Sequence, residues 1–284
     1  MIKQATFKTY IFTMIALVAF AANSVLCRLA LDIYQMDPAS FTVVRLLSGA
    51  LVLFAIIHIR NPHKTIKSTP SSDWISALML FIYAATFSFA YVTLDTATGA
   101  LILFASVQIS IVGYSIFSHG NLNKVEWLGL TLAFSGFLYL IYPDISSPSS
   151  TGFLLMSIAG MAWAVYTVRG KGSKKPLFDT AQNFIHTLPF ILLLGLIMLP
   201  QAQLNTQNIL LAILSGGIAS GLGYAIWYQA LAGLTHTQAS VIQLSVPVIA
   251  ALGGIVFVFE GITGHFMVSS TLILAGILIV IRGR

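Results

Sequence analysis

Apolar residues run along this chain in long stretches separated by short polar segments. Ten stretches can be traced, each near the roughly 20 apolar residues that a helix needs to cross a membrane. A barrel strand would instead alternate apolar and polar residues over about ten positions. The pattern therefore predicts an all-α membrane protein with ten transmembrane helices, near residues 9–30, 38–59, 74–94, 97–118, 124–142, 152–170, 179–199, 207–231, 238–259 and 264–281.

The composition excludes several classes of protein. Of the 284 residues, 57% are hydrophobic and only 8% are charged, against about 25% charged residues in soluble domains. The mean hydropathy is +0.91. These values exclude a soluble enzyme, a nucleic-acid-binding domain and a disordered chain. Cys27 is the single cysteine, so no disulfide can form within the chain.

Basic residues mark one side of the predicted membrane. If the N-terminus is cytoplasmic, Arg28 alone lies among the outer segments and Arg45 lies within a span. Cytoplasmic loops carry an excess of Lys and Arg, so we expect both termini in the cytoplasm and the protein in the cell (inner) membrane. A patch for anionic lipids remains an alternative. The inner segments then hold Lys3, Lys8, Arg60, Lys64, Lys67, Lys124, Arg169, Lys171, Lys174, Lys175, Arg282 and Arg284.

The chain divides into two similar halves, residues 1–145 and 146–284, with five predicted spans each. The segment Phe20–Asn23 leads to Arg28, and Met161–Ala164 leads to Arg169 at the same spacing. Because five is odd, the second half enters the membrane upside down relative to the first. Inverted repeats are typical of transporters; a structural bundle without a pathway is the alternative.

Several motifs together resemble one family of transporters. They are Pro38-Ala39-Ser40-Phe41 before Arg45, the segment from Gly223 to Leu231, Ser245-Val246-Pro247-Val248, and Phe259-Glu260-Gly261. In this order they resemble the ten-span EamA-type branch of the drug/metabolite transporter (DMT) superfamily. The resemblance implies two EamA-like repeats and the movement of small organic solutes, commonly the export of amino acids or related metabolites. The first half departs from the family at Ser106, often proline, and at His119, often glutamate.

Polar side chains within the first two spans are candidate substrate ligands. Arg45 lies seven residues after Pro38, which at 1.5 Å per residue is about 10 Å inside the outer boundary. Asn23 lies at a similar depth in the first span. The pair could bind each other or, through the guanidinium fork, a substrate carboxylate. Snorkelling of Arg45 to the interface is the structural alternative.

The seventh and ninth spans offer further candidates. Asn183 and His186 are three residues apart and so share a helix face; His186 could bind substrate, carry a proton, or join two helices. Gln108 and Gln243 lie at related places in the two halves. Pro247 frees a carbonyl about one turn earlier, which predicts a helix kink that lines a cavity or a packed kink.

Aromatic residues recur on the third, sixth and eighth spans. Some belong to interface belts, while others would line a cavity for a small amphipathic solute. Packing is the alternative for each of them. The set comprises Tyr83, Phe87, Tyr91, Trp163, Tyr166, Tyr224, Trp227 and Tyr228, of which Tyr83, Tyr91, Trp163, Trp227 and Tyr228 are candidate substrate contacts.

Acidic residues are absent from the middle of every predicted span. A carboxylate relay deep in the membrane is therefore not expected, and coupling falls to His186 or to a boundary acid such as Glu260; uniport and exchange remain open. The sequence has no metalloprotease or serine-hydrolase motif, so we expect no enzyme, no cofactor and no metal site.

The sequence thus predicts a carrier that works by alternating access through a central cavity. We expect the path between spans 1, 3, 4, 6, 8 and 9, with a small-molecule substrate, the lipid bilayer and a proton as partners, and no nucleic acid. The expected substrates are small organic metabolites, especially amino acids or related compounds, moved outward. Export of drug-like or nucleoside-type solutes is the alternative, and an integral membrane protein without transport activity is a remote one.

Overall fold

The computed structural model describes residues 7–60, 73–119, 124–141, 148–170, 173–234, 239 and 242–282. All regular elements in these residues are helical, as the long apolar runs predict. The first half consists of α1 (Phe7–Arg28), η1 (Leu29–Ile33), α2 (Pro38–Arg60), α3 (Trp74–Ala90), α4 (Thr96–His119) and α5 (Lys124–Ile141). The second half consists of α6 (Ser150–Gly170), α7 (Pro176–His186), α8 (Leu188–Met198), η2 (Leu199–Gln201), α9 (Thr206–Ile213), η3 (Leu214–Leu222), α10 (Gly223–Leu231), α12 (Val246–Gly253), η4 (Gly254–Val258) and α13 (Gly264–Arg282).

Helical segments overlap each of the ten predicted stretches. Within the described residues, six are long and apolar enough to cross a membrane: Phe7–Ile33, Pro38–Ile59, Thr96–Tyr114, Ser150–Gly170, Pro176–Gln201 and Thr206–Leu231. Shorter apolar helices cover Trp74–Ala90, Val246–Val258 and Gly264–Val280. The number of crossings and the side of the termini stay predictions. The boundary at 145/146 and the predicted loop charges Lys3, Lys64, Lys67, Lys171 and Arg284 lie outside the described residues.

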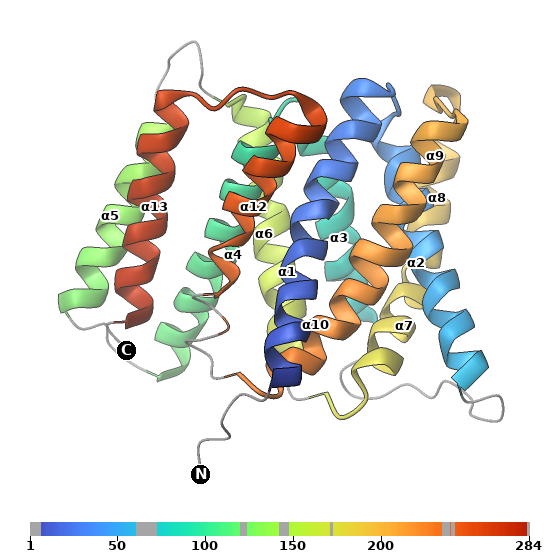
Figure 1. Cartoon of the computed structure of the whole chain (residues 1–284). Coiled ribbons are helices and arrows are strands. Elements are labelled where there is room, and N and C mark those ends of the chain that lie inside the picture. Colours follow the sequence, from blue (N-terminus) through green and yellow to red (C-terminus); the bar gives the residue numbers. More distant parts are fainter. Residues whose placement is uncertain are drawn as a thin grey trace.

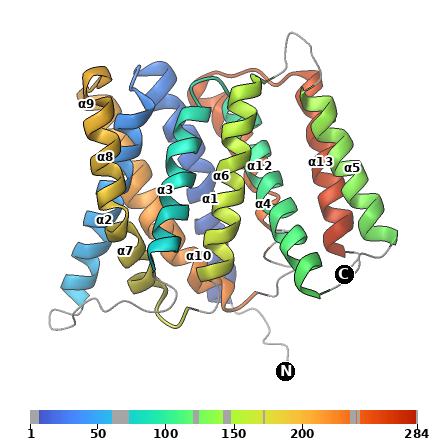
Figure 2. The same cartoon turned by 180° about the vertical axis from the view of Figure 1, so that it is seen from behind.

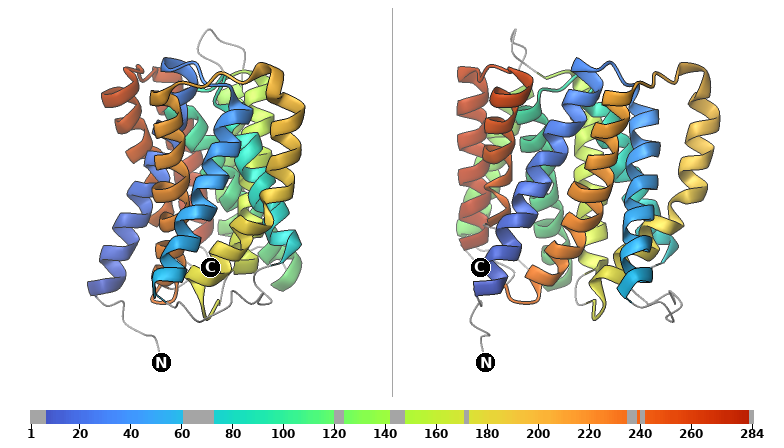
Figure 3. Two further views of the ribbon diagram at one scale, coloured as in Figure 1. Left: turned by 90° about the vertical axis from the view of Figure 1, so that its right-hand side faces the viewer. Right: turned by 45° about the vertical axis from the view of Figure 1, so that its right-hand side comes forward.

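The helices run roughly parallel to one another and form an elongated bundle (Figure 1). α5 and α13 form a pair at one edge, while α8 lies at the opposite edge; the reverse view shows the same order (Figure 2). The helices α1, α3, α4, α6 and α10 occupy the middle. Two further views show that α1 begins and α13 ends at the same face (Figure 3).

The outer surface of the bundle is strongly apolar. On α8 a row of large side chains is exposed, with Leu196 at 63% and Ile197 at 64% of their full accessible area. Contiguous apolar surface of this kind is unfavourable in water. The surface therefore suits the hydrocarbon of a bilayer, in agreement with the membrane class predicted from the composition.

Glycines bring α2 and η3 into close contact. A Cβ atom added at Gly216 would lie 1.9 Å from the carbonyl oxygen of Arg45, so only glycine fits there. On the facing helix, a Cβ at Gly49 would lie 2.3 Å from the Phe184 ring. Small residues allow this close approach of two helices in a membrane bundle.

We predict that Gly216→Ala destabilises the protein, because the methyl group must displace backbone of α2. Overpacking of this kind costs about 1–3 kcal/mol. The melting temperature of the detergent-purified protein is the measurement. Gly113→Ala is the matched control, since nothing lies within 4 Å of a Cβ at Gly113. Equal melting temperatures for the two variants would contradict the prediction.

Candidate functional site

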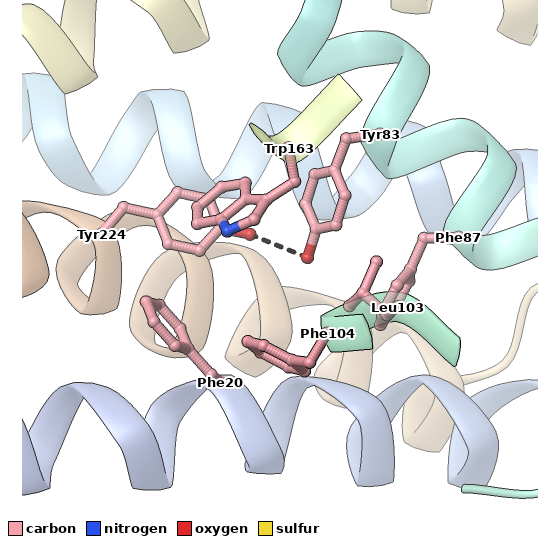
Figure 4. Close-up of a pocket in the computed structure, with 7 residues that line it drawn as sticks. All are labelled: Phe20, Tyr83, Phe87, Leu103, Phe104, Trp163 and Tyr224. Atoms are coloured by element: carbon pink, nitrogen blue, oxygen red, sulfur yellow. Dashed lines mark hydrogen bonds between the residues drawn. The ribbon is translucent and has the colours of Figure 1, made fainter. Parts of the chain in front are cut away.

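A small aromatic cavity lies in the middle of the bundle (Figure 4). The Trp163 ring is 4.5 Å from the Tyr224 ring and 5.0 Å from the Tyr83 ring, centroid to centroid. The cavity volume is about 10 Å³, close to the smallest space that holds one water, so the aromatic walls have closed on one another. α1, α3, α4, α6 and α10 provide the lining residues Phe20, Tyr83, Phe87, Leu103, Phe104, Trp163 and Tyr224.

This position agrees in part with the predicted path. Spans 1, 3, 4, 6 and 8 were expected around the cavity, and each contributes lining residues. The predicted ninth span, which holds Gln243 and Pro247, does not line it. Among the candidate residues, Tyr83 and Trp163 form its wall. Phe20, Leu103 and Phe104 were not predicted, because an apolar residue within an apolar span carries no local signal of its position.

Arg45 lies directly behind two walls of the cavity. Its side chain is 1% exposed. The Nη2 atom donates hydrogen bonds to the hydroxyls of Tyr83 at 3.1 Å and Tyr224 at 3.0 Å, and Nε donates to Ser220 Oγ at 3.1 Å. The guanidinium points into the bundle, so the snorkelling alternative is wrong.

The contacts of this buried charge, among the residues that the structure describes, are with neutral groups. The guanidinium carbon lies 4.8 Å from the centre of the Phe87 ring, within the range of a cation–π contact. Within the described residues, the ion pairs of 4.0 Å or less involve Arg28 and Arg169 and not Arg45. The Nη1 atom is buried without a hydrogen-bond partner. The site therefore holds one positive charge with no opposite charge beside it.

Asn23 completes the polar cluster from α1. Its Nδ2 donates to Tyr83 Oη at 3.2 Å, so Asn23 and Arg45 meet on one hydroxyl rather than on each other. Its Oδ1 accepts from Ser215 Oγ and, at 3.5 Å, from Ser220 Oγ. Both serines belong to the π-helix η3, whose i→i+5 hydrogen bonding brings residues five apart toward one side.

A second polar group lies beyond the cavity lining. Asn183 Nδ2 donates to Tyr166 Oη at 3.3 Å, and Tyr228 Oη donates to the Tyr166 carbonyl at 3.4 Å. Asn183 Oδ1 is buried without a hydrogen-bond partner. These residues lie outside the cavity lining, so Asn183 and Tyr228 stay candidates for a neighbouring part of a pathway.

His186 lies apart from this group, although it was expected to share a face with Asn183. Its ring stacks on Trp74 with centroids 4.7 Å apart, and its Nε2 is 2.8 Å from Gln182 Nε2. Both residues lie in α7, three residues apart as predicted, but their side chains have different partners. These contacts favour the structural role for His186.

The other candidates lie in packed surroundings. Tyr91 is fully buried at the corner between α3 and α4, where its hydroxyl donates to the Thr96 carbonyl at 3.3 Å. Trp227 packs on Phe20 with ring centroids 5.6 Å apart, and its Nε1 has no partner. Gln108 lines a separate cavity between α4, α5 and α13.

The ninth predicted span is interrupted before Pro247. Residues 244–245 form a turn, and α12 begins at Val246 with the proline in its first turn. Gln243 is 4% exposed, and its Oε1 has no hydrogen-bond partner. The proline thus stands at a break in the helix rather than at a gentle kink.

Ion pairs join the two halves at one face of the bundle. Arg28 Nε lies 3.1 Å from Glu260 Oε1, and the same guanidinium lies 3.4 Å from Asp32 and 3.7 Å from Asp95. The Glu260 carboxylate also accepts the Thr96 N–H at 2.8 Å, at the start of α4. We call Arg28, Asp32, Asp95 and Glu260 the Arg28 cluster. Glu260 therefore caps the start of α4.

A second ion pair joins the halves at the opposite face, where α6 ends and α3 begins (Figure 1). Arg169 contacts the Asp73 carboxylate and donates to Ser76 Oγ at 3.2 Å. We call these three residues the Arg169 cluster. Partial burial raises the pKa of Asp73, but the hydrogen bonds from Ser76 and Arg169 outweigh it and hold that pKa below its usual value.

The sequence did not predict these two ion pairs. The equal spacing that ends in Arg28 and in Arg169 indicated that the two arginines correspond to each other in the two halves. Their partners are 232 and 96 residues away in the sequence, and nothing local identifies them.

We predict that Asp73→Asn destabilises the protein near pH 6 and that the difference from wild type shrinks as the pH falls toward 3. The folded-state pKa of Asp73 is lowered, so its stabilisation is present above the unfolded pKa, about 3.9, and is lost as the pH falls through the folded value. Both side chains of the pair are 34% exposed, so the effect is about 0.2–1 kcal/mol. Melting temperatures over this pH range test it; a difference that grows toward pH 3 would contradict it.

Several known proteins are similar to this chain, over 61% to 98% of its length. An uncharacterized protein of Pseudomonas aeruginosa is 42% identical over 278 residues, 98% of this chain and 96% of that protein. An uncharacterized transporter of Bacillus subtilis is 24% identical, covering 86% of this chain and 87% of its own. A protein of Salmonella typhimurium described as a probable amino-acid metabolite efflux pump is 29% identical over 61% of this chain and 62% of its own.

A solved crystal structure has the same fold, with a TM-score of 0.63 at 19% identity over 94% of this chain and 95% of that one. The model of the EamA-like transporter family matches twice, over residues 7–142 and 150–282. The resemblance noted in the sequence motifs is confirmed, and the chain belongs to the EamA-like transporter family.

Proposed function

We propose that this transporter exports small organic metabolites, in particular amino acids or related compounds, by alternating access through the aromatic cavity. The proposal includes ten spans in two inverted five-helix repeats, 1–145 and 146–284, with both termini in the cytoplasm of a cell (inner) membrane. The sidedness rests on the distribution of Lys and Arg. The outward direction draws on the name of the Salmonella relative.

One observation carries the mechanism. Equivalent arginines of the two halves close ion pairs between the halves at opposite faces, with the closed cavity between them. A carrier must open one face while the other stays closed, by rocking one half against the other. Breaking the Arg28 cluster would open the cavity toward one face of the bundle, and breaking the Arg169 cluster would open it toward the other face.

The walls of the cavity support the substrate class. Aromatic rings with few polar groups suit a small amphipathic solute. Exporters of drug-like or nucleoside-type solutes would use the same rings for stacking, so this class remains the alternative. Among the coupling candidates, Glu260 has the closer connection to the mechanism, because protonation of its carboxylate would weaken the contact with Arg28.

The test is counterflow in proteoliposomes with a pooled set of labelled amino acids and small metabolites, with and without a pH gradient. Saturable flux of an amino acid or related metabolite supports the proposal, and dependence on the gradient shows proton coupling. Flux of nucleosides or drug-like solutes alone would favour the alternative. No flux of any solute, from protein shown to be folded and inserted, would contradict a carrier.

We predict that Glu260→Gln opens the face that holds the Arg28 cluster. The native Cys27 reports this opening, since it is fully buried beside Arg28 and is the single cysteine of the chain. Loss of about 1 kcal/mol from the closed state raises the open population about fivefold. We expect Cys27 to react with a water-soluble maleimide faster by about that factor.

Asp95→Asn is the matched control for this experiment. Asp95 belongs to the same cluster, but its side chain is 63% exposed and 3.7 Å from Arg28. Its removal should leave the rate for Cys27 close to that of wild type. Equal rates in Glu260→Gln and wild type would remove the gating role of the Glu260–Arg28 pair.

A further inference from the structure

We propose that Arg45 and the hydroxyls around it form a receptor for one carboxylate group of the substrate, with the apolar body of that substrate among the aromatic rings. The inference rests on the proposed carrier function, because it assigns the central cavity to the substrate. It narrows the substrate class to carboxylates with an aromatic or aliphatic body.

The cluster contains more hydrogen-bond donors than acceptors. Tyr83 Oη accepts from Asn23 Nδ2 and from Arg45 Nη2, at 3.2 and 3.1 Å. Tyr224 Oη donates to the same oxygen at 3.2 Å (Figure 4). A hydroxyl oxygen has two lone pairs, so three donors exceed what it can accept well.

Two buried donors on residues around the cavity have no acceptor. Arg45 Nη1 carries two N–H groups and has no acceptor. Trp227 Nε1, whose ring packs on the cavity residue Phe20, also lacks one. A buried donor without a partner is costly, so the site is incomplete until an acceptor enters. A carboxylate offers about four lone-pair sites and no donor, and is the group that fits best.

The positive charge of Arg45 also favours a carboxylate ligand. The guanidinium is always protonated and is a poor group to bury without an opposite charge. Its described neighbours are phenols, a serine and a phenyl ring. A ligand carboxylate would supply the missing negative charge, and the guanidinium fork can hold it with two parallel hydrogen bonds.

The remaining walls decide what the carboxylate is attached to. The lining residues include no acid, so a cationic ligand would meet Arg45 without compensation. Trp163 and Phe104 offer apolar surface within the same cavity. The site thus favours an anionic, apolar-bodied acid over the corresponding amine.

Before the acid can reach Arg45, Tyr83 and Tyr224 must move apart. The Tyr83–Tyr224 hydrogen bond separates Arg45 from the cavity, and the cavity itself is too small for an organic molecule. The carboxylate would replace Tyr83 and Tyr224 as the partner of Nη2 and give Nη1 its first acceptor. Ligand binding therefore shifts the protein toward a widened state.

The experiment measures affinity for matched pairs of ligands on the purified full chain. The probes are phenylacetate, 3-phenylpropionate and hexanoate, each with its neutral amide, together with 2-phenylethylamine. We expect at least one acid to bind about tenfold or more tightly than its amide, and the amine to bind most weakly. Equal affinities for acids and amides, or no binding of any acid, would overturn the inference.

Variants of Arg45 test whether this residue causes the preference for acids over amides. Arg45→Met should remove the preference for the acid, while Arg282→Gln, an equal change of charge at an exposed position, should keep it. If Arg45→Met does not fold, Arg45→Lys decides, because it keeps the charge but loses the fork: the preference should fall but remain. A preference equal to that of wild type in either variant would exclude Arg45 as the receptor.

Failure of the inference can be told apart from failure of the proposed function. Counterflow of a pooled solute without any preference for acids in binding would keep the carrier and remove the carboxylate receptor. Acid binding that depends on Arg45, without flux of any solute, would keep the receptor and remove the carrier.

Discussion

The structure depends on one buried charge, the guanidinium of Arg45, which lies in an apolar bundle without an opposite charge beside it. The cost of this charge is several kcal/mol unless hydrogen bonds satisfy it. Three separate elements meet that need: α3 provides Tyr83, η3 provides Ser220, and α10 provides Tyr224. The π-helix η3, which packs closely on α2 at Gly216, brings Ser220 to Arg45 on α2 and Ser215 to Asn23 on α1. Removing any one element would leave the others arranged around an unsatisfied charge.

The two ends of the bundle follow a different rule. Ion pairs at partly exposed positions contribute little because water screens them, and Arg169 with Asp73 is of this kind. Weak contacts suit a place that must open repeatedly, while the residues around Arg45 are buried between the two faces and are joined by hydrogen bonds from three elements. The placement of breakable ion pairs at the faces and of the aromatic cavity between them thus agrees with the work of a carrier. The break before Pro247 and the turn between α7 and α8 add points where helices can move separately.

The predictable features were those that one residue or one run of residues carries by itself. Apolar run length located the helices, and an arginine inside a span identified Arg45 because such residues are rare there. Features formed by two segments far apart in the sequence, such as the pairing of Arg28 with Glu260, were not predicted. Phe104 looks like any other aromatic residue in an apolar span, so nothing in the sequence indicated that it lines the cavity. Asn183 and His186 lie three residues apart in α7 as predicted, but the spacing did not reveal that the two side chains have different neighbours.

The two ends are not copies of each other, although their arginines are equivalent. Arg28 faces three carboxylates, whereas Arg169 faces the single carboxylate of Asp73. If the Glu260 contact breaks, Asp32 and Asp95 still lie near Arg28 and can keep it from crossing into the bundle. If the Asp73 contact breaks, Arg169 has Ser76 as its remaining described partner. Different partners of the two arginines therefore give each face its own resistance to opening. A carrier built in this way need not open equally easily in both directions, because the free energy of each opening is set by different residues.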